Sequence, residues 1–235
     1  MPTFTDSVVL VTGANGGLGR PFVTAALEHG ARKVYAAART PREWDDERIV
    51  PLTLDVTDPE SVAAAAQAAP DVTVLINNAG ITTHTASLID ISEADLRRNL
   101  EVNFFGPVLL TRAFAPALIA AESAVLIDIH SVASWNAFGG VYSASKAALW
   151  SATNSLRLEL APQGVHVTGV HMGYVDTAMA AGAQGPKLEA APFVESIYTA
   201  VEAGAYEVLG DDLTRSVKAG LSAPVETLYP QLATA

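Results

Sequence analysis

A phenol and an ammonium group lie four residues apart in the segment GGVYSASKAALW, which runs from Gly139 to Trp150. On a helix, positions i and i+4 share one face, so Tyr142 and Lys146 can direct their polar ends to the same point. A close opposite charge favours ionisation of a phenol, by roughly 1–3 pKa units. The pair is therefore a candidate for proton transfer. The alternative is a surface aromatic beside a solvated amine, which is also common at this spacing.

A glycine-rich segment, TGANGGLG, occupies residues 12–19 between an expected strand and an expected helix. Gly13, Gly17 and Gly19 leave no side chain where a pyrophosphate would approach backbone amides at a helix N-terminus. A tight strand–helix turn without a ligand is the alternative. Because both flanking elements are visible in the sequence, we favour a dinucleotide phosphate as the ligand of this turn.

Short aliphatic runs alternate with Ala-rich helical patterns along the chain. The runs are apolar on both faces, which is typical of a parallel sheet covered on both sides; they span 7–13, 33–39, 50–56, 72–80, 124–131 and 165–173. Helical patterns occupy 18–29, 59–68, 92–119 and 143–161, and another lies near 193–204 ahead of a short apolar YEVLG and a polar tail. This alternation predicts an α/β protein: a single Rossmann-type doubly wound domain over 1–235, with a central parallel sheet flanked by helices on both faces.

Composition narrows the classes of partner. Half of the 235 residues are hydrophobic and 17% are charged, so a sizeable core is expected. The net charge of −11 argues against nucleic acid, and the absence of cysteine excludes disulfides and thiolate metal sites; no metal site is predicted. We recognise no signal peptide and no apolar run long enough to span a bilayer, so we expect a cytoplasmic protein without a membrane partner.

Five sequence features occur in a fixed order. They are TGANGGLG, NNAG at 77–80, Asn103 within LEVNFFG, Ser131, and YSASK at 142–146. Together they resemble the short-chain dehydrogenase/reductase family, over about Val8 to Thr177. The resemblance implies an oxidoreductase that transfers a hydride between nicotinamide and a ketone, an aldehyde or a secondary alcohol.

The resemblance also implies four catalytic residues. Tyr142 would be the general acid in reduction and the base in oxidation, with its pKa lowered by Lys146, which would also hold the nicotinamide ribose. Ser131 would hydrogen-bond the substrate oxygen, and Asn103 would steady a water leading from Lys146 toward solvent. Ser134 is a second hydroxyl in the same loop and stays an alternative to Ser131.

The end of the second expected strand bears on the choice of nicotinamide cofactor. An NAD-specific site usually has an acidic residue there, whereas this chain has Ala38 followed by Arg39. Arg39 can bind a 2′-phosphate, with Arg42 assisting, so NADP(H) is favoured over NAD(H); a solvated surface role for Arg39 is the alternative. The resemblance implies further cofactor contacts at Asn15, Leu18, Asp55, Val56, Asn77, Ala79, Gly80, Val175 and Thr177, besides the glycines, Tyr142 and Lys146; Asp55 can equally be a turn residue.

Two positions depart from the family's usual pattern. His130 precedes Ser131 where many relatives have a second Ser, and a His beside a Ser raises the idea of a hydrolase. Neighbours on a strand point to opposite faces, and no GxSxG motif is present, so we expect His130 to be a packed or solvent-bridging residue. Met172 stands where a Pro usually precedes Gly173, and we expect this change to loosen the turn.

The expected substrate is a small, apolar carbonyl compound or alcohol. The Ala- and Gly-rich segment 177–192 is predicted to be a mobile loop over it, with Trp135, Phe138 and Tyr174 near the mouth of the site.

Other classes of function stay open. The main alternative is a non-catalytic NADP-binding redox sensor or scaffold of the same fold. A same-fold epimerase or dehydratase is the weaker one, because such enzymes usually carry a longer substrate domain. The resemblance further implies a homodimer or homotetramer built through the helices 92–119 and 143–161.

Overall fold

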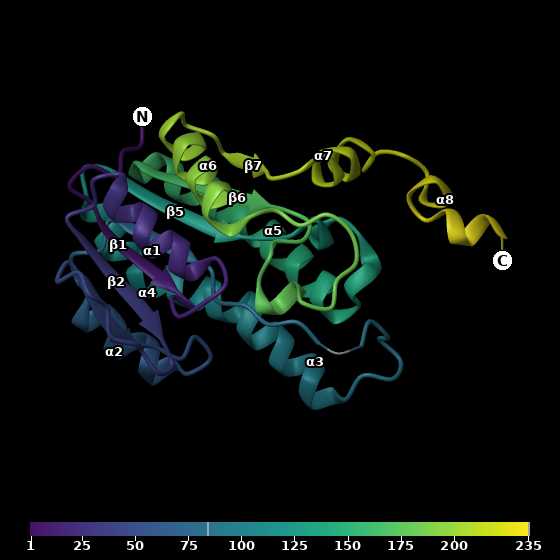
Figure 1. The fold of residues 1–235 in the computed structure, drawn as a ribbon, viewed down its shortest axis with the longest axis horizontal. Helices are drawn as coiled ribbons and strands as arrows, with labels where there is room; N and C mark the ends of the chain where they lie inside the picture. The colour runs from purple at the N-terminus through teal and green to yellow at the C-terminus, as the bar shows by residue number, and fades with distance from the viewer. Residues whose placement is uncertain (84, 235) are drawn as a thin grey trace.

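Seven parallel strands form one sheet in the computed structural model, which describes residues 1–83 and 85–234 (Figure 1). The strands are β1 (Val8–Thr12), β2 (Lys33–Ala38), β3 (Ile49–Thr53), β4 (Val74–Asn77), β5 (Ala124–Ile129), β6 (Val165–His171) and β7 (Glu207–Leu209). Their order is β3-β2-β1-β4-β5-β6-β7. The order reverses between β1 and β4, and this is where ligands bind in doubly wound sheets. The predicted fold class is confirmed.

Helices cover both faces of this sheet. They are α1 (Gly19–Glu28), α2 (Pro59–Ala68), α3 (Glu93–Leu100), α4 (Gly106–Ala120), α5 (Val141–Leu160), α6 (Ala190–Glu202), α7 (Asp212–Ala219) and α8 (Val225–Leu228). Side chains of α1 and α6, such as Phe22 and Ile197, form one buried layer with the sheet. Side chains of α2, α4 and α5, such as Val62 and Phe114, form the other. The central strands are buried on both faces, which explains why their sequences do not alternate.

Two helices begin at residues whose side chains cap them. Asp58 caps α2 by accepting a hydrogen bond from the amide of Glu60 at 3.0 Å. Ser92 caps α3 by accepting from the amide of Asp95 at 3.1 Å, and its hydroxyl donates to the Asp95 carboxylate. Such caps satisfy amides that have no partner inside the helix.

The long helical stretch 93–120 is interrupted by a π-helical turn over Glu101–Phe105, which the sequence pattern did not predict. An 18-residue window in this stretch meets the length and hydropathy criteria for crossing a membrane, although we expect no such run from the sequence. In the structure 39% of that window is buried. Leu110, Phe114 and Leu118 pack into the core between α4 and the sheet, and this burial accounts for the apolar character of the helix.

The C-terminal part has more structure than the expected polar tail. Residues 207–209 add β7 to the edge of the sheet beside β6, and α7 follows directly. In Figure 1, α7 lies beyond the end of β7 and α8 projects away from the sheet. The sequence shows this strand only as the short apolar YEVLG, because three half-buried residues are too few to display a strand period.

Candidate functional site

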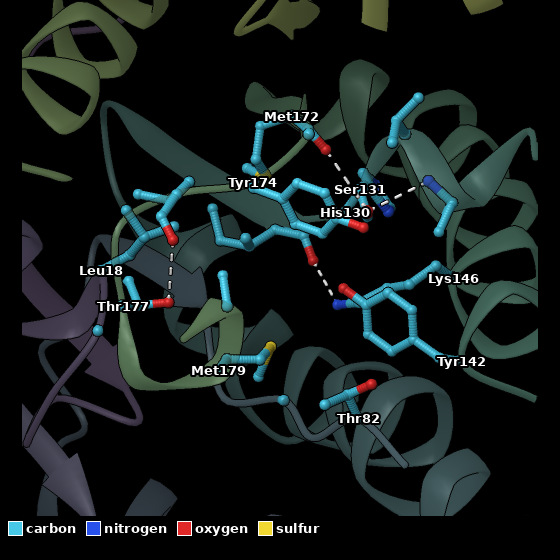
Figure 2. Close-up of a pocket in the computed structure, with 18 of the residues that line it drawn as sticks. Leu18, Thr82, His130, Ser131, Tyr142, Lys146, Met172, Tyr174, Thr177 and Met179 are labelled. Atoms are coloured by element: carbon cyan, nitrogen blue, oxygen red, sulfur yellow. Dashed lines mark hydrogen bonds between the residues drawn. The ribbon is translucent and has the colours of Figure 1, made fainter. Parts of the chain in front are cut away.

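A cavity of about 490 Å³ opens at the carboxyl ends of the central strands (Figure 2). The glycine-rich turn after β1 forms one end of its lining. The segments after β4 and β5, the start of α5 and the segment after β6 form the remainder, together with Leu213 of α7. The segments that follow strands far apart in the sequence therefore meet around this one cavity.

Three of the four predicted catalytic residues line this cavity: Ser131, Tyr142 and Lys146. Figure 2 shows them on one wall. The Ser131 hydroxyl donates to the Met172 carbonyl at 3.4 Å and accepts from the amide of Ala133 at 3.1 Å. Ser134, the alternative hydroxyl, is buried and does not line the cavity, so the structure favours Ser131.

The electrostatics of Tyr142 correct one expectation. Lys146 is buried, and its Nζ donates to the Ile129 carbonyl at 2.7 Å while lying 5.9 Å from the centre of the Tyr142 ring. Burial lowers the pKa of Lys146 to about 8, opposed by the charge of Asp128. Burial raises the pKa of Tyr142, and the Ser131 hydroxyl acts in the opposite direction. The predicted lowering by Lys146 is wrong here because the ammonium faces a strand-end carbonyl; at neutral pH the phenol keeps its proton.

Asn103, the fourth predicted residue, lies beside the cavity wall in the π-helical turn. Its amide nitrogen donates to the Ile81 carbonyl and to Asn99, both at 2.9 Å, and to the Ser145 hydroxyl at 3.1 Å. Its amide oxygen accepts from the backbone nitrogen of Ile81 at 2.9 Å. Asn103 therefore ties the segment after β4 to α5, next to Lys146, while its role toward a water stays a prediction.

The glycine-rich turn has a conformation that requires glycine. Gly13 has φ of +66°, and a Cβ there would lie 3.1 Å from the Cα of Ala79. A Cβ on Gly19 would lie 2.1 Å from the Gly13 carbonyl oxygen. Gly17 and Leu18 line the cavity with Gly13, whereas Gly19 is buried behind them at the start of α1. The turn is a bare backbone cradle at a helix N-terminus, and this fits the pyrophosphate of a dinucleotide.

The NNAG segment divides into two parts. Asn78 lines the cavity and donates to the Thr12 carbonyl at 2.7 Å, which joins β4 to β1. Ala79 and Gly80 also line it, and a Cβ on Gly80 would lie 3.8 Å from the Nζ of Lys146. Asn77 is buried away from the cavity and donates to Asp128 at 2.8 Å. This corrects the prediction for Asn77: its side chain supports the sheet, because successive strand residues face opposite ways.

The residues predicted to contact the adenosine half of a cofactor lie outside the cavity. Arg39 is exposed, and among the described residues its guanidinium forms no ion pair. The Asn15 amide donates to the Thr40 carbonyl at 2.7 Å. Hydrogen bonds from Thr57 lower the pKa of Asp55, although burial opposes them, and the charge of Arg39 adds to the effect. Asp55 thus forms a turn, while its contact with a cofactor stays a prediction. Val56, partly buried, packs at the edge of the core.

The turn after β6 is held on both sides by hydrogen bonds, while the loosening expected from Met172 stays a prediction. The Met172 carbonyl accepts from the amide of Val132 at 2.7 Å. The amide of Gly173 donates to a carboxylate oxygen of Asp211 at 2.7 Å. Sequence reasoning missed Asp211, because it lies in the segment taken as tail.

The segment that follows this turn forms a further part of the cavity lining. Val175 and Thr177 line the cavity as predicted, and Val175 pairs with Leu188 in an isolated bridge. The amide of Asp176 donates to the Leu188 carbonyl at 2.9 Å, which fastens the base of the predicted loop 177–192. Within that loop, residues 178–180 form a short 3-10 turn.

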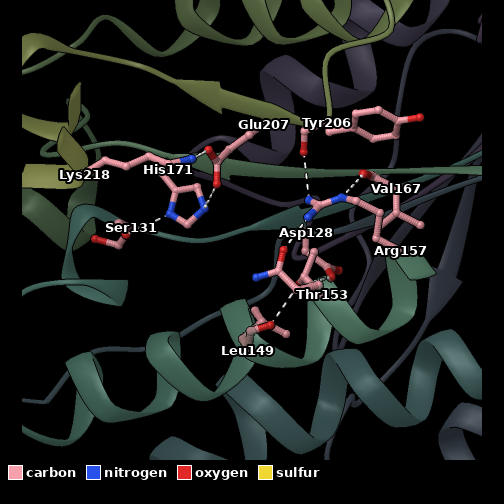
Figure 3. A network of polar contacts seen from close by, with 11 residues as sticks. Asp128, Ser131, Leu149, Thr153, Arg157, Val167, His171, Tyr206, Glu207 and Lys218 are labelled. Atoms are coloured by element: carbon pink, nitrogen blue, oxygen red, sulfur yellow. Dashed lines mark hydrogen bonds and ion pairs between the residues drawn. The ribbon is translucent and has the colours of Figure 1, made fainter. Parts of the chain in front are cut away.

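Two histidines and a tryptophan stack behind Ser131. The ring of His130 lies 4.5 Å from that of His171, which lies 4.0 Å from that of Trp135. The His171 ring hydrogen-bonds the Ser131 carbonyl at 3.3 Å (Figure 3). Burial lowers the pKa of His171 to about 3 and that of His130 well below its usual value, so both rings are neutral. His130 is a packed residue, as expected; Trp135 is part of this stack and not of the cavity mouth, which contains Phe138 and Tyr174.

Several known proteins are similar to this chain in sequence, and one solved structure is similar to it in fold as well. The sequence profile described as short chain dehydrogenase matches residues 7–187. An NADPH-dependent 1-acyldihydroxyacetone phosphate reductase of Schizosaccharomyces pombe is 36% identical over 204 residues, 82% of this chain and 68% of that protein. Short-chain dehydrogenase PC-15 of Penicillium crustosum is 36% identical over 181 residues, 72% of this chain and 66% of that protein. The chain thus spans about two thirds of the length of these relatives.

A solved structure matches nearly the whole chain. It is a short chain dehydrogenase from Burkholderia cenocepacia in complex with NADP, 37% identical, with a TM-score of 0.90 over 98% of this chain and 99% of that one.

Proposed function

The chain belongs to the short-chain dehydrogenase/reductase family of oxidoreductases, and from this we propose that it transfers a hydride between NADP(H) and a ketone, an aldehyde or a secondary alcohol. The observation that carries the proposal is the placement of Ser131, Tyr142 and Lys146 on one wall of a cavity that continues to the glycine-rich turn. A protein that only senses a dinucleotide needs the turn but not these three side chains.

The side chains divide the work of reduction among them. Bound NADPH would supply a hydride to the carbonyl carbon. The hydroxyl of Ser131, which accepts from the amide of Ala133 at 3.1 Å, would donate a hydrogen bond to the substrate oxygen in exchange for its long 3.4 Å bond to the Met172 carbonyl. The phenol of Tyr142, whose raised pKa keeps it protonated, is placed to give its proton to the same oxygen. Lys146 and the cradle of Gly13, Gly17 and Leu18 would hold the cofactor.

Two observations support NADP(H) over NAD(H). Arg39 is exposed and free of ion pairs among the described residues, and Ala38 before it leaves no carboxylate to repel a 2′-phosphate. The solved relative from Burkholderia cenocepacia holds NADP, and the Schizosaccharomyces pombe relative is named as NADPH-dependent.

The lining of the cavity favours an uncharged substrate. Phe138, Tyr174, Met179 and Leu213 surround its mouth and are each 48–57% exposed. Among the described lining residues only Lys146 carries a charge, so a phosphate on the substrate would find no guanidinium there. We therefore propose an apolar carbonyl compound, in contrast to the phosphorylated substrate in the name of the Schizosaccharomyces pombe relative.

The absorbance of NADPH tests the proposal. The purified chain is incubated with NADPH and a panel of aliphatic and aromatic ketones and aldehydes, and we expect oxidation with the apolar members. Tight NADPH binding without turnover across the panel would instead support the redox sensor or scaffold.

We also propose self-association through α4 and α5 and a cytoplasmic location. Phe105, just before α4, is 43% exposed, and Leu158 on α5 is 80% exposed. Leu149 of α5 is buried within the subunit, so its side chain is not available to this interface. Light scattering of the purified chain would give a dimer or tetramer mass, and a monomer would contradict the interface.

A further inference from the structure

The segment 207–218 connects the C-terminal edge of the sheet to the cavity. It contains β7, a short turn and α7. Leu213 of α7 lines the cavity, and at the other end of the helix Lys218 pairs with Glu207 and lies 5.4 Å from the centre of the Trp135 ring (Figure 3). One end of α7 thus lies at the cavity that Ser131 lines, and the other end contacts Trp135 in the segment after Ser131.

Asp211 joins this helix to the turn after β6. One carboxylate oxygen accepts from the amide of Gly173 at 2.7 Å. The other accepts from the amide and the hydroxyl of Thr214, each at 2.7 Å, and so caps α7. Burial opposes ionisation, but the bonds from Thr214 and Gly173 and the charge of Arg215 lower the pKa of Asp211. At neutral pH a carboxylate therefore makes charge-assisted hydrogen bonds in two directions.

The geometry at Gly173 shows how closely this carboxylate approaches the turn. A Cβ at this position would lie 2.9 Å from the nearer Asp211 oxygen. Gly173 has a negative φ, so its backbone conformation does not require glycine. The close approach of the Asp211 carboxylate explains why a side chain does not fit at this position. The same turn leads directly to Val175 and Thr177, which line the cavity and which the family resemblance predicts to contact the cofactor.

We propose that Asp211 is a positioning residue that holds the turn at Gly173 in place for the nicotinamide end of the cofactor, an inference that rests on the proposed NADP(H) function. Asp211 acts through a backbone amide and touches neither substrate nor cofactor. Asp211 lies 38 residues after Gly173 in the sequence. The family profile matches residues 7–187, so Asp211 supports the cavity from a segment outside the matched region.

Two variants break this contact from opposite sides. Asp211→Ser keeps one oxygen to cap α7, since Ser is a good N-cap, but loses the carboxylate that reaches Gly173. Gly173→Ala leaves Asp211 free to cap α7 and pushes the turn away from it. Asp212→Ser is the matched control, because the Asp212 side chain is 99% exposed and, among the described residues, pairs with Arg215 alone.

The experiment measures the binding of two ligands to each variant. NADPH spans the whole site, whereas adenosine 2′,5′-bisphosphate occupies only the adenosine half. We expect Asp211→Ser and Gly173→Ala to weaken NADPH binding about tenfold, the factor that loss of one charge-assisted hydrogen bond gives. Their affinity for the bisphosphate should stay that of the parent, and Asp212→Ser should bind both ligands normally.

Three outcomes would overturn the inference. Parent-like NADPH affinity in both variants would show that the contact does not position the turn. Equal losses for both ligands would show general disruption of the fold. A parent chain that binds neither ligand would refute the proposed function itself.

Discussion

Removal of the Arg39 guanidinium should change the affinity for NADPH and leave the affinity for NADH alone. The two cofactors differ only in the 2′-phosphate, and Arg39 is the cation that follows Ala38 at the end of β2. In the described residues its guanidinium makes no ion pair and interacts with Asp55 only through its charge, so we expect Arg39→Ala to fold like the parent.

The expected loss of NADPH affinity depends on how exposed the Arg39 guanidinium is. A hydrogen bond to a charged group contributes about 1.5–3 kcal/mol. An exposed cation contributes less because water screens its charge, so we take about 1–2 kcal/mol for the Arg39 guanidinium. This range corresponds to a loss of roughly 5–30-fold in NADPH affinity. Because surface charge attraction is screened by ions, the difference from the parent should shrink as salt is added.

Fluorescence titration of parent and variant with NADPH and with NADH measures this prediction. Arg42→Ala is the matched control: its guanidinium lies 5.1 Å from the Trp44 ring and donates to the Glu43 carbonyl, so a smaller loss is expected. An equal loss of both cofactors in Arg39→Ala, or none of either, would refute the reasoning on cofactor choice.

Three further predictions concern the wall of the cavity and its support. Lys146 is charged below about pH 8 and neutral above it, so NADPH affinity measured by fluorescence should fall between pH 7 and pH 9; a flat profile would argue against its cofactor role. Thr153→Val removes a 2.7 Å hydrogen bond to buried Asp128 and should lower the free energy of unfolding in urea by about 1–3 kcal/mol, while Thr153→Ser should be milder; equal stability would contradict this. Gly140→Ala places a Cβ 2.3 Å from the Ala86 carbonyl oxygen and should destabilise more than Gly164→Ala, whose Cβ meets open space and which should cost about 1–2 kcal/mol; the reverse order in the same assay would be incompatible with the structure.

Much of the fold and site could be predicted because the signals are local. The strands before and the helix after TGANGGLG are visible as short patterns, and YSASK places Tyr142 and Lys146 on one helical face. Ser131 follows β5 directly, so a motif at a strand end reaches the cavity without knowledge of distant contacts.

The remainder depends on contacts that a local pattern does not encode. Asp211 meets Gly173 across 38 residues, and β7 is too short to show a period. The pKa of Tyr142 depends on which way Lys146 points, and Lys146 reaches the Ile129 carbonyl. Asn77 faces Asp128 because strand residues alternate, although its motif alone suggested a cofactor contact.

The central claim is that the phenol of Tyr142 gives its proton to the substrate oxygen. A single-turnover measurement on Tyr142→Phe, saturated with NADPH and an active ketone, tests it most directly. We expect the rate of NADPH oxidation to fall by about 10²–10⁴-fold, the usual contribution of a general acid, with NADPH affinity near that of the parent. A variant that oxidises NADPH at the parent rate would contradict the account.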